Sequence, residues 1–429
     1  MKDTISSFLL AVVLTITLTS TNLATDWPQW RGPFFNGSSD EKDLPLSWSR
    51  TENIKWISPL PGPSGATPVI SNGKVFVSSM VKDTSDFVAL CFDAETGKQL
   101  WSREIGSNQR NFRRNTAASP SPVANGKNVF FMYGSGDLAG FDFEGNKLWA
   151  RNIENDYGKL SVQFGYSSSP LLFNDKLFIP VIRRASEQND NPLESFIMAL
   201  DPKTGETLWK QPRQTNAYSE SMEAYTTPIP MIRNEKLQIL NTGADFITAN
   251  DPDTGEELWR FEYRRSKVRD SRIVPSLVTD NNLIFGTQYK NKGIFALQPP
   301  DSNSTGKILW EFDEAAPDVC TPLLYQNKLY VLDGKQSKLV TCLDPNTANK
   351  FWQGKIEGRG PWRASLTAGD GKLYCINETG EVVVLKAGGE KFEIIFETKI
   401  EEAPIQSSIA IANGHLFIRT AENLYCIGK

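Results

Sequence analysis

The chain has very little histidine and no closely spaced cysteines. Its 429 residues include one histidine, His415, which lies within a strand-like pattern. A site with several histidine ligands, or a histidine-based catalytic triad, therefore has at most this one candidate. The cysteines lack the CxxC and CxxCH spacings of metal and c-type haem sites, and their odd number leaves at least one thiol unpaired. They are Cys91, Cys320, Cys342, Cys375 and Cys426. The sequence predicts no metal site.

The chain also lacks an excess of positive charge. Its formal net charge is −4, whereas a general nucleic-acid binder needs a basic surface to displace counterions from phosphates. Apolar residues make up 39% of the chain and aromatic residues 11%, which is too much for a disordered protein and enough for a large core. We therefore expect a globular protein that does not bind nucleic acid.

Long hydrophobic runs are missing as well. The longest near the N-terminus, from Phe8 to Leu18, follows Lys2 and precedes small and polar residues up to Ala24. It is well short of the roughly 20 residues that span a bilayer and resembles the apolar region of a secretory signal peptide. The prediction is a signal peptide over residues 1–24, cleaved near Ala24, and a mature protein in the periplasm or outside the cell. An uncleaved membrane anchor remains the alternative.

An eleven-residue pattern recurs through the rest of the chain. It is clearest from Cys91 to Trp101, from Ala199 to Trp209 and from Ala249 to Trp259, where Asp-x-x-Thr-Gly is followed by a tryptophan. Altered copies run from Gly140 to Trp149, from Ala296 to Trp310, from Cys342 to Trp352 with Ala348 in place of the glycine, and from Val384 to Phe396. The last copy starts at Cys426 and stops with the chain. Such self-similarity indicates a repeat architecture.

A second pattern precedes each copy. A Ser or Thr, often followed by Pro, leads into apolar residues and then into Asn-Gly-Lys or a variant, as at Thr67-Pro68 and Asn72-Gly73, at Ser169-Pro170, at Thr321-Pro322 and at Ser408. Asn-Gly and Thr-Gly are hairpin turns, because their residues tolerate a positive φ. Each unit is therefore four short antiparallel strands, and a spacing of roughly 40 to 50 residues is that of propeller blades.

Eight units can be counted, but the last lacks its fourth strand. A strand-like segment with a tryptophan, from Asn53 to Leu60, stands before the first unit. Pairing it with residues 424–427 closes the ring without an open edge. The fold predicted is all-β: an eight-bladed β-propeller of four-stranded antiparallel blades over residues 53–429, closed by its N-terminal and C-terminal strands. Residues 25–52 form an N-terminal extension.

The repeated motif resembles the tryptophan-docking motif of quinoprotein alcohol dehydrogenases and of smaller pyrroloquinoline-quinone-like propellers. The opening Asp26-Trp27-Pro28-Gln29-Trp30-Arg31-Gly32-Pro33 is similar to the start of exported proteins in that group. In size the chain is also similar to the propeller of the outer-membrane assembly lipoprotein, although it has no cysteine for acylation. The resemblance implies structural docking residues, with small residues such as Cys91, Cys342 and Cys426 seated beneath them. They are Trp56, Trp101, Trp149, Trp209, Trp259, Trp310 and Trp352.

The resemblance also implies what a catalytic relative would contain. A quinoprotein dehydrogenase would have an adjacent Cys-Cys pair beside the quinone, calcium ligands and an Asp base, and long insertions between blades. No two cysteines are adjacent here, and the inter-blade segments are mostly short. We therefore expect a non-catalytic binding or scaffolding module without a cofactor. The alternative is a dehydrogenase that binds pyrroloquinoline quinone and calcium through degenerate motifs.

The candidate ligand site lies where the blades meet. If the Asn-Gly and Thr-Gly turns share the lower face, the loops that precede the innermost strands share the upper face. Residues at the ends of these loops should approach a central funnel, where aromatic and Arg side chains suit a planar or anionic ligand or a peptide segment. They are Arg114, Tyr166, Tyr225, Arg272, Trp362 and Arg363. Alternatively, they fill the channel mouth and pair with nearby carboxylates. We expect a monomer whose partner is a protein or carbohydrate of the cell envelope.

Overall fold

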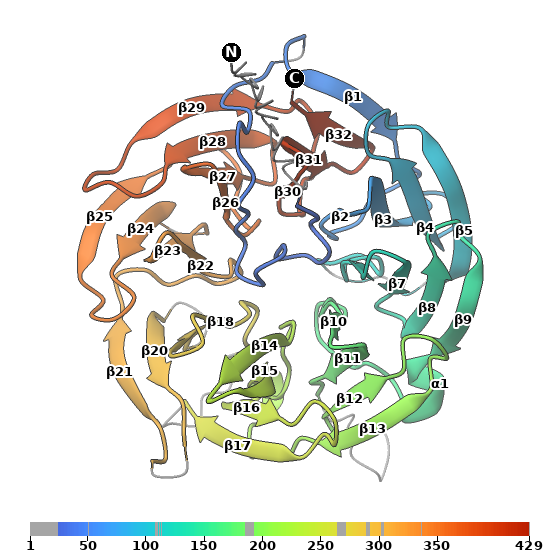
Figure 1. The fold of residues 1–429 in the computed structure, drawn as a ribbon, viewed down its shortest axis with the longest axis vertical. Helices are drawn as coiled ribbons and strands as arrows, with labels where there is room; N and C mark the ends of the chain where they lie inside the picture. Colours follow the sequence, from blue (N-terminus) through green and yellow to red (C-terminus); the bar gives the residue numbers. More distant parts are fainter. Residues whose placement is uncertain are drawn as a thin grey trace, which may run out of the picture.

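Among the residues that the structure describes, thirty-two strands form eight four-stranded antiparallel sheets arranged in a ring (Figure 1). The computed structural model describes residues 25–49, 51–107, 110, 112, 114–184, 193–263, 272–288, 292–301, 304–335 and 337–428. The predicted signal peptide lies outside these residues. One short helix, α1 (Ile153–Tyr157), and a 3-10 helix, η1 (Ser219–Met222), lie in loops of the described part. No helix there is long and apolar enough to cross a membrane.

The first four blades follow one another along the chain. Blade 1 contains β2 (Val69–Ser71), β3 (Lys74–Met80), β4 (Asp86–Asp93) and β5 (Gln99–Ser107). Blade 2 contains β6 (Val123–Ala124), β7 (Asn128–Met132), β8 (Asp137–Asp142) and β9 (Lys147–Asn152). Blade 3 contains β10 (Leu171–Phe173), β11 (Lys176–Val181), β12 (Phe196–Leu200) and β13 (Thr207–Pro212). Blade 4 contains β14 (Ile229–Arg233), β15 (Lys236–Gly243), β16 (Phe246–Asn250) and β17 (Glu257–Glu262).

The other four blades complete the ring. Blade 5 contains β18 (Val278–Thr279), β19 (Ile284–Thr287), β20 (Ile294–Gln298) and β21 (Lys307–Phe312). Blade 6 contains β22 (Leu323–Tyr325), β23 (Lys328–Asp333), β24 (Leu339–Leu343) and β25 (Lys350–Lys355). Blade 7 contains β26 (Thr367–Gly369), β27 (Lys372–Ile376), β28 (Glu381–Lys386) and β29 (Ile394–Lys399). Blade 8 contains β30 (Ala410–Ala412), β31 (His415–Arg419), β32 (Asn423–Ile427) and, as its outer strand, β1 (Ile54–Pro59).

Blade 8 joins the two ends of the chain. Strand β1 pairs antiparallel with β32, so that Trp56 lies opposite Cys426 and Pro59 lies opposite Asn423. Figure 1 shows the blue β1 outside the dark red β32. The predicted fold and its closure by terminal strands are confirmed, and the outer edge of β32 is covered by a strand of its own chain.

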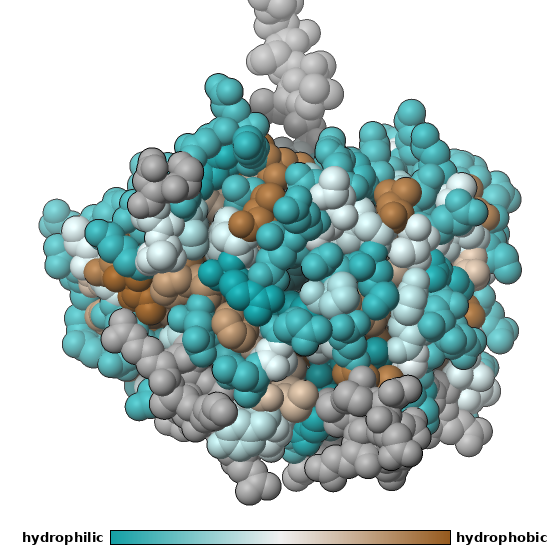
Figure 2. All heavy atoms as spheres, turned by 90° about the horizontal axis from the view of Figure 1, so that it is seen from below, coloured by the Kyte–Doolittle hydropathy of each residue, from teal (hydrophilic) through white to brown (hydrophobic). Residues whose placement is uncertain are grey.

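Burial along the strands follows their place in the blade. In β7 the four residues after Asn128 are all buried, because the middle strands pack against both neighbouring blades. In the outer strand β21 exposed and partly buried residues alternate, because one face meets solvent. Leu100 and Leu148 therefore point outward beside a docking tryptophan. Figure 2 shows that the rim facing the viewer is mostly hydrophilic, with small and separate hydrophobic patches.

Six of the seven docking tryptophans link one blade to the next. The indole of Trp56 donates from Nε1 to the carbonyl of Ala94, in the Asp-x-x-Thr-Gly turn of blade 1, at 3.0 Å. A Cβ on Gly97 would lie 2.5 Å from that indole, and φ there is +71°. The turn needs glycine for both reasons. The equivalent bonds start from Trp101, Trp149, Trp209, Trp310 and Trp352.

Trp259 is the exception among these side chains. It is half-buried, and its Nε1 donates at 2.9 Å to Gln238 of its own blade. The next turn, in blade 5, carries the insertion seen in the sequence, and Pro299 and Pro300 occupy it. The carbonyl of Pro299, at the place of the usual acceptor, instead accepts a 3.0 Å bond from Arg233. In blade 6, Ala348 keeps the positive φ of the glycine that it replaces, at +59°.

The N-terminal extension crosses the lower side of the ring. Trp27 exchanges two backbone hydrogen bonds of 2.9 Å with Ile70 of β2, and Ser38 forms a parallel bridge with Ala368 of β26. Between them, the ring of Phe35 packs edge-on against Phe173 of β10, with centroids 5.5 Å apart. In Figure 1 this dark blue segment reaches the middle of the ring. It therefore ties together blades that are far apart in the sequence.

Candidate functional site

The central channel opens on the upper face as a pocket of about 340 Å³, which we call the funnel. The backbone bond from Ala94 to Gly73 puts the Thr-Gly and Asn-Gly turns of blade 1 on one face, the lower one. The loops before the innermost strands are at the opposite ends of the strands, and they line the funnel. Trp30 of the N-terminal extension lines it as well.

A closed ring of hydroxyl groups surrounds the channel. The backbone N–H of Thr67 donates to the hydroxyl of Ser121 at 2.9 Å, and each blade repeats this bond toward the next. The last bond runs from the N–H of Ser408 back to Thr67 at 3.2 Å. The members are Thr67, Ser121, Ser169, Thr227, Ser276, Thr321, Ser365 and Ser408. The recurrent Ser or Thr of the sequence thus satisfies an N–H at the channel edge of each blade, where there is no strand to pair with.

Trp30 and Arg31 close the funnel below the hydroxyl ring. Arg31 is buried, and its guanidinium donates at 2.9 Å to the carbonyls of Leu366 and Pro322, each directly after a ring residue. Burial lowers the pKa of Arg31 to about 9. Trp30 precedes it and faces the cavity. The funnel therefore has a floor, and a ligand enters and leaves from the upper face.

Opposite charges are paired along one side of the funnel. Arg272 bridges two carboxylates, with Nη1 at 2.9 Å from Glu220 and Nη2 at 3.6 Å from Asp318. Lys335 approaches Asp318 at 3.1 Å. The side chains of Arg272, Glu220 and Asp318 are at most 9% exposed and are largely shielded from solvent, whereas Lys335 is exposed. This group of four joins four upper loops and has no net charge.

The other side of the funnel contains Arg363 and Arg114. Arg363 pairs with Glu378 at 2.5 Å. Arg114 lies with its guanidinium carbon 5.7 Å from the ring centre of Phe164, and no described residue provides a carboxylate for it. Tyr225 completes this wall: its hydroxyl donates to Glu223 at 3.1 Å.

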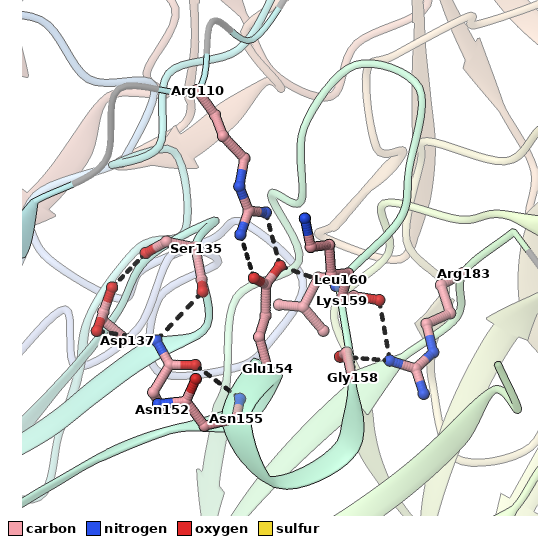
Figure 3. A network of polar contacts seen from close by, with 10 residues as sticks. All are labelled: Arg110, Ser135, Asp137, Asn152, Glu154, Asn155, Gly158, Lys159, Leu160 and Arg183. Atoms are coloured by element: carbon pink, nitrogen blue, oxygen red, sulfur yellow. Dashed lines mark hydrogen bonds and ion pairs between the residues drawn. The ribbon is translucent and has the colours of Figure 1, made fainter. Parts of the chain in front are cut away.

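The loop that carries Arg114 is anchored from outside the funnel. Arg110 makes a two-pronged ion pair with Glu154 of α1, and Glu154 also accepts a 2.9 Å bond from the N–H of Leu160 (Figure 3). In the same view Arg183 donates to the carbonyls of Gly158 and Lys159. This network fixes two neighbouring upper loops, and so the approach of Arg114 to the funnel.

The structure brings together four of the six residues predicted to reach the funnel: Arg114, Tyr225, Arg272 and Arg363 line it. The other two do not. Tyr166 is buried between blades, with its hydroxyl donating to Pro180 at 2.6 Å and its pKa raised by burial. Trp362 is fully buried in the core around blades 6 and 7. Successive side chains of an extended segment point to opposite sides, so Trp362 faces the core and its neighbour Arg363 the funnel.

Several lining residues were not predicted from the sequence. Trp30 belongs to an extension outside the repeat, and Asp318, Lys335 and Glu378 belong to loops that carry no motif. The hydroxyl residues were visible as a pattern, but not as a ring. Only the last group had a signal that could have identified it, namely one Ser or Thr at the same place in every unit.

The cysteines and the histidine lie away from the funnel. Each of the five thiols is buried and unpaired. Burial raises the pKa of Cys91, Cys320, Cys342 and Cys426 to about 12 and also raises that of Cys375. His415 lines a separate pocket on the lower side, beside residues of the N-terminal extension. In the described part of the chain, no group of three His, Cys, Asp or Glu side chains is placed to hold a metal ion.

Solved structures share the fold at low sequence identity. BamB from Moraxella catarrhalis has a TM-score of 0.61 at 14% identity, with 87% of this chain and 100% of that chain covered. A quinohemoprotein alcohol dehydrogenase from Comamonas testosteroni has a TM-score of 0.66 at 13% identity, covering 94% and 80%. A europium-containing methanol dehydrogenase has a TM-score of 0.64 at 10% identity, covering 93% and 90%. Among curated proteins, none matches the sequence.

The family comparison is more specific than these folds. The profile described as outer membrane protein assembly factor BamB matches residues 39–183 and 194–353, which is most of the propeller. The matched region includes six of the eight ring hydroxyls and all seven docking tryptophans. The chain belongs to the family of the outer membrane protein assembly factor BamB.

Proposed function

We propose that this protein is an exported, non-catalytic binding module of the cell envelope that presents its upper loops and funnel to a partner. One observation carries the proposal. Every described Arg, Lys, Asp and Glu side chain lining the funnel, apart from Arg114, is held in an ion pair, and neither a thiol nor an imidazole is among the lining residues. A general base or nucleophile needs a free and activated group. The funnel instead offers fixed hydrogen-bond donors and rings, which suit recognition.

A protein partner is favoured over a carbohydrate. The family is described as an assembly factor for outer membrane proteins, and the funnel combines Arg with Tyr, Trp and Phe, side chains enriched in protein-binding hot spots. The upper loops that surround it are irregular segments on a rigid ring, the usual place for binding residues. We expect the protein to act as a monomer in the periplasm or outside the cell, after loss of residues 1–24.

The second candidate is a quinone-dependent dehydrogenase, favoured by the fold shared with two alcohol dehydrogenases. The residues of the funnel do not fit this group well. Both lining carboxylates, Asp318 and Glu378, are already paired with cations, so neither is free to bind calcium. No pair of adjacent cysteines lies beside the site. We therefore derive no step through a quinone.

The test blocks the funnel and measures capture of a partner. Ser167→Trp places an indole in the lining of the funnel, whereas Lys98→Trp adds the same group to an exposed turn of the lower face. We expect the wild type and Lys98→Trp to retain the same protein from envelope extract, and Ser167→Trp to lose it. Equal capture by both variants would contradict the proposal. So would dye reduction by the protein after addition of pyrroloquinoline quinone and calcium, with a bound absorption band.

A further inference from the structure

Among the described residues that line the funnel, a single cation has no carboxylate partner. The other three cations each face a carboxylate, in two groups whose charges cancel. The first group contains Arg272, Lys335, Glu220 and Asp318, and the second contains Arg363 and Glu378. Arg114 remains, with no carboxylate near it in the described part of the chain. The described lining of the funnel therefore carries one uncompensated positive charge.

Arg114 is held where a ligand can reach it. Its guanidinium lies over Phe164, a stacking arrangement that suits arginine. The guanidinium carbon of Arg272 lies 4.9 Å from the centre of the same ring. The carbonyl of Arg114 accepts a 3.4 Å hydrogen bond from the side-chain amide of Gln406, in the loop before blade 8. The side chain is exposed and lines the cavity. It is thus positioned at the mouth of the funnel, with free donors.

Hydroxyl donors lie deeper in the same cavity. Six members of the hydroxyl ring line it, and each hydroxyl oxygen accepts a backbone N–H. A hydroxyl that accepts one bond still has its own proton to donate. An oxygen anion in the funnel would therefore meet donors from Arg114 above and from the ring below. Trp30, Val274 and Val319 supply apolar surface beside these donors.

The closed floor limits the shape of the ligand. A volume of about 340 Å³ is at the small end of the roughly 300–1,000 Å³ of ligand pockets. Because Trp30 and Arg31 close the lower end, a chain that enters the funnel cannot pass through, and the space is too small for it to turn back. A chain end fits both limits. The C-terminus of a polypeptide also brings one carboxylate next to one side chain.

We propose that the funnel binds the C-terminal residue of a protein partner, with its carboxylate paired to Arg114 and its apolar side chain against Trp30 and Phe164. This inference rests on the proposed function, because it supplies the recognition element of the same site. One unpaired cation in the described lining matches the one carboxylate of a chain end. A ligand with several negative charges would bring carboxylates for which this lining has no unpaired cation.

The experiment compares two labelled peptides. Fluorescein-Gly-Ser-Gly-Ser-Phe with a free C-terminal carboxylate, and the same peptide ending in an amide, are titrated against the mature protein by fluorescence anisotropy. We expect the acid to bind at least about tenfold more tightly than the amide. Arg114→Gln should abolish this difference, and Arg114→Lys should keep part of it. Lys98→Gln removes the same charge from the lower face and should behave as the wild type.

Several results would overturn the inference. They are equal binding of acid and amide, binding of neither, or a difference that persists in Arg114→Gln. 3-Phenylpropionate tests for a free small acid: if it displaced the label at the same concentration as unlabelled peptide, the assignment to a chain end would be wrong. Capture from envelope extract separates the two proposals. If Arg114→Gln captured the partner as well as the wild type, this inference would fail and the proposed function would stand. No capture by the wild type would contradict the proposed function itself.

Discussion

Trp56 should contribute more to stability than the exposed residues of β1, because it contacts β32, Phe417 of blade 8 and the turn of blade 1. Its side chain is 9% exposed, its backbone lies opposite Cys426, and its ring centre is 6.0 Å from that of Phe417. Its indole also bonds to Ala94 in blade 1. Replacing a buried Trp by Ala typically costs about 3 to 5 kcal/mol. For a domain of this length the entropy of unfolding converts that cost into a fall in Tm of about 4 to 6 °C.

Trp259→Ala is the matched control for Trp56→Ala. It removes the same side chain at the same position of the repeat, but Trp259 is half-buried and bonds within its own blade. We expect a cost of about 1.5 kcal/mol and a fall in Tm of about 2 °C. Differential scanning calorimetry of both variants measures the difference. Equal shifts in Tm for the two variants, or a Trp56→Ala variant with the Tm of the wild type, would refute the idea that the terminal strand stabilises the fold by closing the ring.

Three further predictions concern the turns, the hydroxyl ring and the thiols. Gly97→Ala should destabilise the protein by about 1 to 3 kcal/mol more than Gly73→Ala in chemical denaturation: both residues have a positive φ, but only the first Cβ meets an indole, at 2.5 Å. Equal costs would show that the indole yields. Thr67→Val should lower the free energy of unfolding by about 1 to 3 kcal/mol in the same assay, because it leaves the buried N–H of Ser408 without its acceptor. An unchanged denaturation midpoint would mean that the hydroxyl ring does not stabilise the fold. The five cysteines should react with a thiol reagent at pH 8 only after denaturation, because burial raises their pKa and so favours the unreactive thiol; rapid labelling of the native protein would contradict their burial.

The repeat made the ring predictable from the sequence. Each copy of the motif predicts the same turns and the same tryptophan position, so the copies support one another. Counting the strands then showed that a strand is needed beside β32, which β1 provides. The floor of the funnel was not predictable in this way. Trp30 and Arg31 occur once, and their contacts with Pro322 and Leu366 join segments about 300 residues apart. No local pattern reports such contacts.

The funnel itself was predictable only in part. The alignment of the repeats placed Arg114 and Arg272 correctly at the end of their loops, but a shift of one residue reverses the direction of a side chain. That is why Trp362 lies in the core while Arg363 lines the cavity. The ion pair of Asp318 with Arg272 joins loops that lead into two different blades, and the ion pair of Glu378 with Arg363 joins two separate loops beside blade 7. Neither approach follows from the sequence of a single loop.

The unbroken hydroxyl ring has a consequence for how the protein opens. In a linear array of repeats, a terminal unit frays by losing one neighbour, so local unfolding begins at the ends. Here every blade donates to one neighbour and accepts from another, and blade 8 has the same two partners as the rest. Detaching any blade breaks two interfaces at once. Hydrogen exchange of the innermost strands should therefore be uniform around the circle, with protection that approaches the free energy of global unfolding and no blade acting as the weak end.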